Sequence, residues 1–386
     1  MPDSISTPLN ETPPNPKPGL FNIKHSKRDF QKKASWSKNK FNSSFPTALA
    51  LYMESQGLPL VYLKLGSDLR TVEKSTITTS ELFGLDLLTT EAYLDYETPY
   101  SPYAGFVTSG QTPKVDLKVL NHETQDVLSG FEIKLTVVPD DATHELDEQY
   151  WGSELVIRMP SLIFLACSIA KTYEHDLPRL KRFFGKSGSF GAFNNYREPA
   201  QVNTILPKIG EIIHAIIADN INNQRPTLIQ PIWKTMGKRA KLAENCLDVF
   251  VWSDLAFTRL FLANAYTTPA TITKDIDRPT RAVIQLFFML HEYALNGKFN
   301  PHAIQNALSY KTKNDKAFSV SGRVTNPIMD CAELRTPRVR RDQIKEIILN
   351  GGEEFLSPER RFDAVLVSSI GLFEEQEKKR GRNESD

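Results

Sequence analysis

The stretch PKVDLKVLNHETQDVLSGFEIKLTVVP, residues 113–139, contains two runs in which apolar and polar residues alternate. Alternation with a period of two is typical of a β-strand that buries one face. The apolar positions are Val115, Leu117 and Val119 in the first run and Phe131, Ile133, Leu135 and Val137 in the second. The polar residues 121–125 predict a turn, and Gly130 predicts a bulge or a close approach of another group. The stretch is therefore expected to form a β-hairpin.

The polar face of this hairpin would bring together Asp116, Glu132 and Lys134. Two carboxylates suit Mg²⁺, which takes one or two protein carboxylates and keeps waters for substrate or nucleophile. A lysine beside them can orient the attacking water, help to deprotonate it and balance the developing negative charge. We predict that all three are catalytic residues of a phosphodiester hydrolase, with Asp116 and Glu132 as metal ligands. Asp, a spacer and then Glu-x-Lys is the signature of the PD-(D/E)xK nuclease core.

Two further points stay open at this stage. An acid-x-Lys triplet arises by chance in most chains of this length, so a solvated strand face is the alternative interpretation of the hairpin. Glu81 and Glu97 lie upstream of Asp116 and are candidates for an additional metal ligand. A capping or surface role is the preferred interpretation of each, so neither joins the predicted catalytic residues.

The composition predicts a soluble globular protein, since 40% of the 386 residues are hydrophobic and 24% are charged. The net charge of +1 excludes a global polycation, so a nucleic-acid interface would be a local basic cluster. Cys167, Cys246 and Cys331 lie far apart, which argues against a structural zinc site. An odd cysteine count without an export signal fits a reducing cytoplasm, and the longest apolar stretch, 161–170, is too short to cross a bilayer.

Four regions are expected along the chain. Residues 1–20 form a proline-rich flexible leader, 21–175 a nuclease core with a basic N-terminal arm, 176–375 a mainly helical region, and 376–386 a charged tail. The arm between Lys24 and Lys40 contains seven Lys and Arg residues and one acidic residue, with aromatic residues interleaved. Such an arm can follow a phosphate backbone, and a solvated basic tail is the alternative.

Local patterns place elements within these regions. In the core they predict a helix from Phe45 that stops at Gly57, a strand over 60–65, and a helix over 81–88 capped by Thr79 or Ser80. A third strand over 151–159 precedes a buried helix over 160–173. Apolar spacing of three and four predicts helices over 205–220, 244–265 and 278–295.

The region after residue 175 is expected to recognise DNA or to form a dimer. Four arginines within Arg335–Arg341 favour an extended segment against phosphates or guanine edges, and a surface role is the alternative. His214 and His291 lie within predicted helices and are expected to be packed or surface side chains.

Two regions of the chain resemble the HindVP-type (HgiDI-like) type II restriction endonucleases of the PD-(D/E)xK superfamily. The first contains GLF at 19–21, KRDF at 27–30 and WSKNKFNSSFPTALALYM at 36–53. The second runs from YETPYSPY at 96–103 through Asp116-Leu117 to GFEIKLTVVPD at 130–140. The resemblance covers roughly the first 160 residues. It departs from the usual pattern in lacking a proline before the first aspartate, since Lys114 and Val115 precede Asp116.

This resemblance implies an α/β fold, a mixed sheet flanked by helices with a largely helical C-terminal half. It implies a homodimer that uses Mg²⁺ to cut both strands of DNA at a short palindrome. It also implies a functional pairing with a cognate DNA methyltransferase and a location in the bacterial cytoplasm. The namesake enzymes act on GRCGYC. A palindrome needs one active site per strand, which matching subunits supply. A non-catalytic DNA-binding protein and a repair or nonspecific nuclease of the same superfamily are the alternatives.

Overall fold

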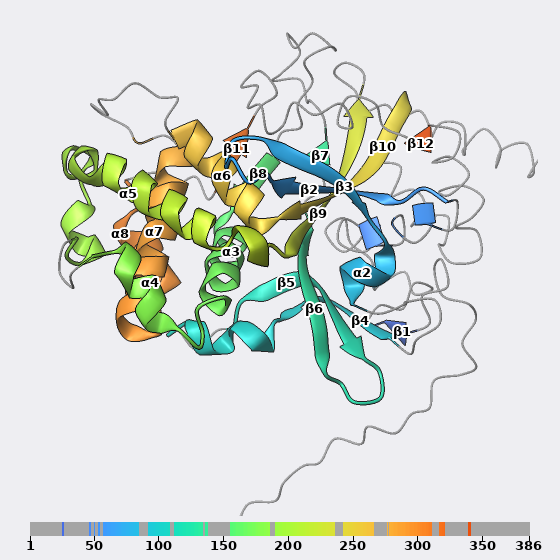
Figure 1. Ribbon diagram of the computed structural model, residues 1–386, viewed down its shortest axis with the longest axis horizontal. Helices are drawn as coiled ribbons and strands as arrows, with labels where there is room; N and C mark the ends of the chain where they lie inside the picture. The colour runs from blue at the N-terminus through green and yellow to red at the C-terminus, as the bar shows by residue number, and fades with distance from the viewer. Residues whose placement is uncertain are drawn as a thin grey trace, which may run out of the picture.

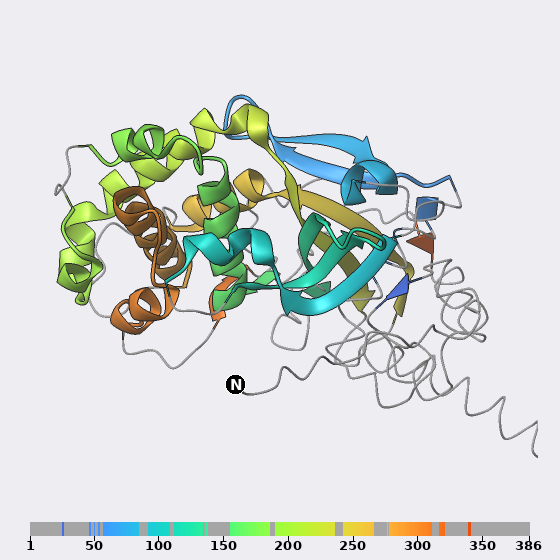
Figure 2. The ribbon, with the colours of Figure 1, turned by 90° about the horizontal axis from the view of Figure 1, so that it is seen from below.

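The structure, a computed structural model, describes residues 25–26, 46–47, 50, 53–54, 57–84, 92–108, 112–133, 136–137, 155–185, 190–235, 242–265, 276, 278–310, 316–320 and 339–340. Over these residues the protein is a mixed α/β protein. Helices α3 to α8 gather on one side of the molecule, and most of the main sheet lies on the other (Figure 1, Figure 2). None of the described helices is long and apolar enough to cross a membrane.

The main sheet contains ten strands in the described part of the chain, in parallel and antiparallel pairs. Eight follow one another in the order β1 (His25–Ser26), β4 (Ala92–Pro99), β5 (Lys114–Asn121), β6 (Val127–Ile133), β9 (Pro226–Thr235), β10 (Leu242–Ser253), β2 (Leu60–Leu65) and β3 (Val72–Ile77). β7 (Thr136–Val137) pairs with β9, and β12 (Val339–Arg340) pairs with β10. A second sheet joins β8 (Leu155–Arg158) to β11 (Lys316–Val320).

Strands β4, β5 and β6 form an antiparallel meander, and β9 lies beside β6 in parallel. A parallel pair needs a long crossover connection. Here the connection between β6 and β9 includes three helices, α3 (Met159–Lys171), α4 (Leu177–Phe183) and α5 (Pro199–Asp219). The chain therefore leaves the sheet soon after Glu132, builds much of the helical side, and returns next to the same strand.

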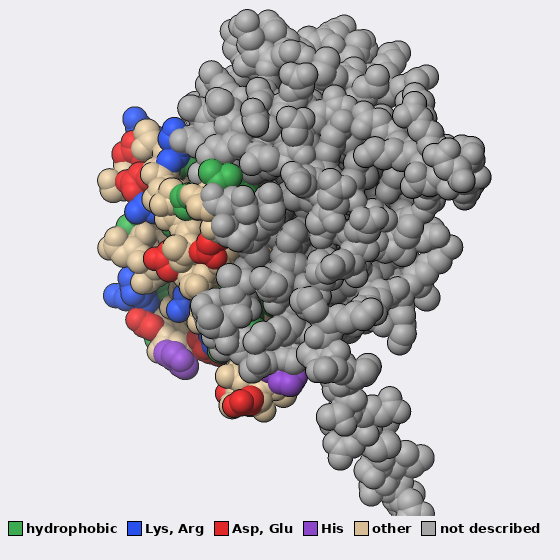
Figure 3. All heavy atoms as spheres, turned by 90° about the vertical axis from the view of Figure 1, so that its right-hand side faces the viewer, with side chains coloured by type: hydrophobic (Ala, Val, Ile, Leu, Met, Phe, Trp, Pro, Cys, Tyr) green, Lys and Arg blue, Asp and Glu red, His purple; other side chains and the backbone are tan. Residues whose placement is uncertain are grey.

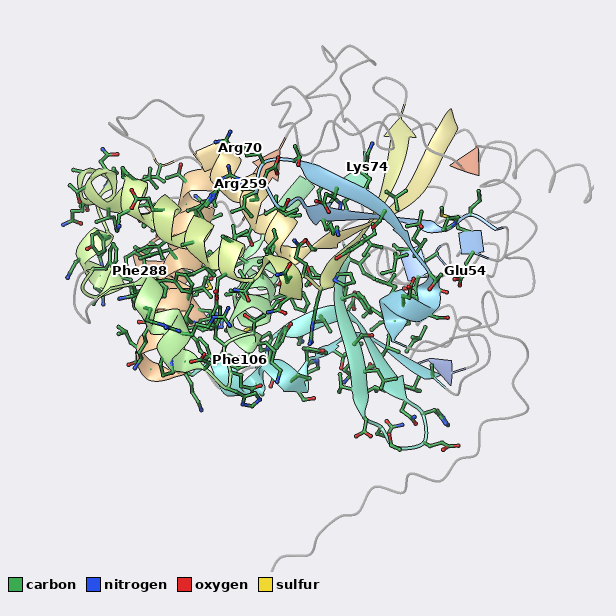
Figure 4. All side chains as sticks on the ribbon, in the orientation of Figure 1. Glu54, Arg70, Lys74, Phe106, Arg259 and Phe288 are labelled. Carbon is green, nitrogen blue, oxygen red and sulfur yellow. The ribbon has the colours of Figure 1, made fainter. Side chains whose placement is uncertain are left out.

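Helix α7 (Arg278–Asn296) is the centre of the helical side, because every residue from Thr280 to His291 is buried. Around it lie α6 (Asp254–Ala265), α8 (Pro301–Ala307) and the 3₁₀ helix η3 (Ser101–Phe106). The ring of Phe106 packs on Tyr293 of α7 at 5.3 Å between centroids (Figure 4). Nε of Arg259 donates to the Leu69 carbonyl at 2.8 Å, which ties α6 to the β2–β3 turn (Figure 4).

Most of the predicted elements are confirmed. The hairpin forms as β5 and β6, its turn is held by the Asn121 side chain, and the strand over 60–65 is β2. Residues 46–47, 50 and 53–54 are helical, and Gly57 has a φ of 71° just after them, as its stop position requires. The helices predicted over 160–173, 205–220 and 278–295 correspond to α3, α5 and α7.

Two predictions need correction. The short helix is α2 (Thr79–Phe83), and its N-cap is Thr78 rather than Thr79 or Ser80. The single helix predicted over 244–265 is wrong for its first half, because residues 242–253 form β10 and only Asp254–Ala265 is helical. Val251 and Trp252 are consecutive in β10 and both are buried, so both faces of the strand are covered there and its apolar residues do not alternate with polar ones. A short apolar run of this kind is ambiguous between helix and strand. The region after residue 175 therefore also contributes β9 and β10 to the main sheet.

Candidate active site

Asp116 and Glu132 lie on adjacent strands at the end of the β5–β6 ladder. The last paired residues at this end are Leu117 of β5 and Phe131 of β6. The next residue is Asp116 on β5 and Glu132 on β6. The amide of Ile133 donates to Oδ2 of Asp116 at 2.7 Å, which fixes that carboxylate against β6. Facing residues of an antiparallel pair share one side of the sheet, with Cβ atoms about 5 Å apart. The alternation therefore places the two predicted metal ligands side by side.

The Glu132 carboxylate is buried, with 5% of the residue exposed. The Ser161 hydroxyl donates to its Oε1 at 2.6 Å. Ser161 belongs to the first turn of α3, where backbone N–H groups and the helix dipole favour a negative charge. The site thus keeps a buried carboxylate in a polar setting. Ser161 was not among the predicted site residues, and the only sequence signal for it is its position directly after Pro160 at the start of a helix.

Tyr100 covers the middle of β6, two residues before Glu132, and explains Gly130. A Cβ atom placed on Gly130 would lie 2.5 Å from Cε2 of Tyr100, so only glycine fits beneath the ring. The same ring packs on Phe164 of α3, at 6.5 Å between centroids. The close approach predicted at Gly130 is confirmed, and it helps to set the position of α3, from which Ser161 reaches Glu132.

Lys118 is a second lysine on the polar side of β5, two residues from Asp116. Its Nζ lies 3.2 Å from Oδ2 of Asp95 on β4, and both side chains are 13% exposed. Nζ also donates to the Pro99 carbonyl at 3.4 Å. Lys118 is therefore held against β4 by an ion pair and a hydrogen bond. Lys134, the predicted catalytic lysine, lies outside the described residues, so its role stays a prediction.

The two additional glutamates have different places in the structure. The Glu81 carboxylate accepts from the Thr78 amide at 2.8 Å and from its hydroxyl at 2.9 Å, which completes a capping box at α2. These bonds hold the pKa of Glu81 below its usual value. Glu97 lies in β4, across from Asp116. Among the residues that the structure describes, no three His, Cys, Asp or Glu side chains are placed to hold one metal ion together.

The histidine predictions are confirmed. The ring of His291 stacks on Phe287 at 5.9 Å and lies among Phe184, Phe190 and Phe288, and burial lowers its pKa. His214 is half-buried on α5, where burial and then Arg259 and Arg70 lower its pKa. Cys167 is buried and its thiol pKa is raised by burial. These groups therefore belong to packing rather than to the candidate site.

The predicted basic contacts with DNA lie largely outside the described residues. That holds for nearly all of the arm around Lys24–Lys40, and of Arg335–Arg341 only Val339 and Arg340 are described, as strand β12. On the described part of the face in Figure 3, basic, acidic and histidine side chains lie intermixed. That part of the surface therefore carries no patch of a single sign.

Comparison with known proteins places the chain among the type II restriction enzymes. The enzyme HgiDI of Herpetosiphon aurantiacus is 39% identical over 358 residues, which cover 93% of this chain and 98% of that protein. A protein named "Probable type II restriction enzyme HindVP" of Haemophilus influenzae is 36% identical over 359 residues, which cover 93% of this chain and 96% of that protein.

The family model of the HindVP restriction endonuclease matches residues 36–373. The chain belongs to the HindVP restriction endonuclease family. The resemblance seen in the first part of the sequence therefore extends through the second half, where no single motif had indicated it. No solved structure gives a significant match.

Proposed function

We propose that this protein is a type II restriction endonuclease that cuts both strands of DNA at a short palindrome in a Mg²⁺-dependent reaction. The observation that carries the proposal is the facing pair Asp116 and Glu132 on β5 and β6. It occurs in a chain that belongs to a restriction endonuclease family. A PD-(D/E)xK core is proposed on the same grounds, and the mixed sheet with helices beside it supports this core.

The donor set fits a small hard cation. Both groups are carboxylates on neighbouring strands, and Mg²⁺ takes one or two protein carboxylates at about 2.1 Å and fills its other positions with water and substrate oxygens. When bound, the ion would polarise the scissile phosphate and lower the pKa of a water molecule. A magnesium site at this place needs no third carboxylate ligand from the protein.

The protein groups have separate roles in the proposed mechanism. Asp116 is oriented by the Ile133 amide, and Glu132 is oriented by the Ser161 hydroxyl, so neither carboxylate has to reorganise when substrate binds. Lys134 is proposed to position the attacking water and to balance charge on the phosphate. Lys118, two residues from Asp116, is paired with Asp95.

The palindromic target leads to a proposed homodimer. Each DNA strand of such a site presents the same sequence, so two identical subunits place one active site on each strand. The site GRCGYC of the namesake enzymes is the first candidate target. A nuclease of this kind requires a methyltransferase that protects the same sequence in a bacterial host, and it would act in the cytoplasm. The region 176–375 and the basic arm are the proposed DNA-recognition and dimer surfaces.

The test is digestion of a long DNA of mixed sequence by the purified full chain with Mg²⁺, with a chelator as control. Discrete fragments whose sequenced ends share one palindrome support the proposal. A smear would instead indicate a nonspecific nuclease, and intact DNA would indicate a non-catalytic DNA-binding protein. Light scattering gives the subunit number, since a dimer has twice the 43.7 kDa mass of the chain.

A further inference from the structure

Two hydrogen-bond donors, Tyr100 and Arg225, lie beside the candidate metal ligands. The parallel register of β6 and β9 sets Glu132 against Leu228, and Arg225 precedes Leu228 by three residues. Three residues of extended chain and one strand spacing give about 11 Å between the Cα atoms of Glu132 and Arg225. Arg225 is exposed and directly precedes β9.

The Tyr100 ring is held by packing on three sides. It lies against Gly130 of β6, two residues before Glu132, where a Cβ atom would meet Cε2 at 2.5 Å. It packs edge-on against Tyr103 at 4.7 Å between centroids, and Phe164 of α3 lies at 6.5 Å. The place of the Tyr100 hydroxyl is therefore set by the fold before any ligand binds.

The two donors lie within electrostatic range of each other. Burial raises the pKa of Tyr100, and the positive charge of Arg225 acts in the opposite direction and lowers it. In the part of the chain that the structure describes, neither the Tyr100 hydroxyl nor the Arg225 guanidinium makes a hydrogen bond or an ion pair. The pair thus presents donors that have no acceptor from these residues.

Asp254 is the acidic neighbour that could neutralise Arg225 from within the fold. Burial raises the pKa of Asp254 to about 6, and Arg225 is among the smaller effects that lower it. The Asp254 carboxylate is buried at the start of α6 and accepts a hydrogen bond from Ser168. Among the described side chains no ion pair joins Asp254 to Arg225. A guanidinium and a hydroxyl in this state suit an anionic oxygen ligand.

A phosphate of the DNA backbone is the anion that fits this place. A DNA strand carries one phosphate about every 3.4 Å along the helix axis. A strand whose scissile phosphate meets Asp116 and Glu132 therefore has further phosphates within the roughly 11 Å that separate Glu132 from Arg225. Arg donates two parallel N–H groups to phosphate oxygens, and a Tyr hydroxyl donates one more hydrogen bond.

We propose that Arg225 and Tyr100 together bind one backbone phosphate of the cleaved strand, one or two positions from the scissile phosphate. This inference rests on the proposed nuclease function. The contact fixes the register of the strand, so that the scissile phosphate lies at Asp116 and Glu132. Because packing already orders the Tyr100 ring, its hydroxyl loses little freedom when the phosphate binds.

The first test measures binding of the full chain to a labelled duplex that contains a cut site mapped by digestion. Ca²⁺ replaces Mg²⁺, and a gel checks that the duplex stays intact. Arg225→Ala should weaken binding about tenfold and reduce the slope of log K against log salt by about 1, since one charged phosphate contact is lost. Tyr100→Phe should weaken binding about fivefold and leave the slope unchanged, because a neutral hydroxyl releases no counterion.

Arg70→Ala and Tyr93→Phe are the matched controls. Arg70 is exposed in the turn between β2 and β3, the strands at the other end of the order from β6 (Figure 4). Tyr93 lies on β4 with its ring 6.3 Å from that of His122 in the hairpin turn. Both variants should bind the duplex as the unmodified chain does. Equal affinities and salt slopes for Arg225→Ala and Arg70→Ala would overturn the inference.

Duplexes with a neutral methylphosphonate identify the phosphate. One duplex is made for each of the two phosphates on either side of the cut, with the same change in both strands of the palindrome. At the phosphate that the pair binds, the change should weaken binding by the unmodified chain about tenfold and have no further effect on Arg225→Ala. A full, additive cost of Arg225→Ala on all four duplexes would overturn the inference.

The digestion of long DNA separates this inference from the proposed function. If the unmodified chain gives discrete fragments and Arg225→Ala binds the duplex normally, the inference fails and the proposed function stands. If the unmodified chain gives no discrete fragments, both fail, because the inference requires a defined cleaved strand.

Discussion

The Ser161 hydroxyl donates to Oε1 of Glu132 at 2.6 Å, and this bond joins the first turn of α3 to the end of β6. Because Glu132 is buried, its carboxylate depends on such a partner for its orientation. The helical side of the molecule thus contacts the candidate site at Ser161.

Ser161→Ala should lower kcat/KM for DNA cleavage about tenfold, since the Glu132 carboxylate loses the bond that orients it. Cleavage of a short duplex under single-turnover conditions gives the rate directly. Ser129→Ala is the control, because Ser129 lies on the same strand as Glu132 but its hydroxyl donates to the Phe83 carbonyl of α2 and not to a carboxylate. Equal rates for the two variants would contradict the role given to Ser161.

Asp116→Asn, Glu132→Gln and Lys134→Ala should each lower the rate of cleavage by roughly a thousandfold, because the first two each remove a proposed metal ligand and the third removes the positive charge proposed to act at the phosphate. Site-specific binding of DNA should remain, since these groups act on the reacting phosphate rather than on the bases. Anisotropy of a labelled duplex measures binding, and plasmid cleavage measures activity. Normal cleavage by any of the three would remove that residue from the mechanism.

Gly130→Ala should lower the free energy of unfolding by about 2 kcal/mol, because the added methyl group overlaps the Tyr100 ring. Urea denaturation followed by Trp fluorescence gives the value. The effect should shrink in a Tyr100→Ala background, where the ring is absent, and a double-mutant cycle measures that coupling. A cost for Gly130→Ala that is the same in both backgrounds would mean that the ring is not what requires glycine.

The sequence predicted the hairpin because apolar and polar residues alternate along both runs, so Asp116 and Glu132 could be placed together from spacing alone. It could not predict Ser161 or the Lys118–Asp95 pair, because both depend on how distant segments pack. The sequence also predicts a helix where the structure has β10. A strand that is covered on both faces loses the alternation that identifies it, as the consecutive buried residues Val251 and Trp252 show.

Asp254 makes the stability of the fold depend on pH. It is buried at the start of α6, where Ser168 donates to its carboxylate, and burial raises its pKa from 3.8 to about 6. Between these values the folded chain holds a proton that the unfolded chain has released. The free energy of unfolding should therefore fall as the pH rises from about 4 to about 6, by on the order of 3 kcal/mol.

Asp254→Asn removes this titration and keeps an acceptor for the Ser168 hydroxyl. The variant should match the unmodified chain in stability below pH 4 and exceed it above pH 6, by up to on the order of 3 kcal/mol. Urea unfolding from pH 3.5 to 8 measures the difference, with the exposed Glu123→Gln as a control that follows the unmodified chain. A variant that is less stable at pH 8 would mean that the charged form of Asp254 is the one the fold prefers.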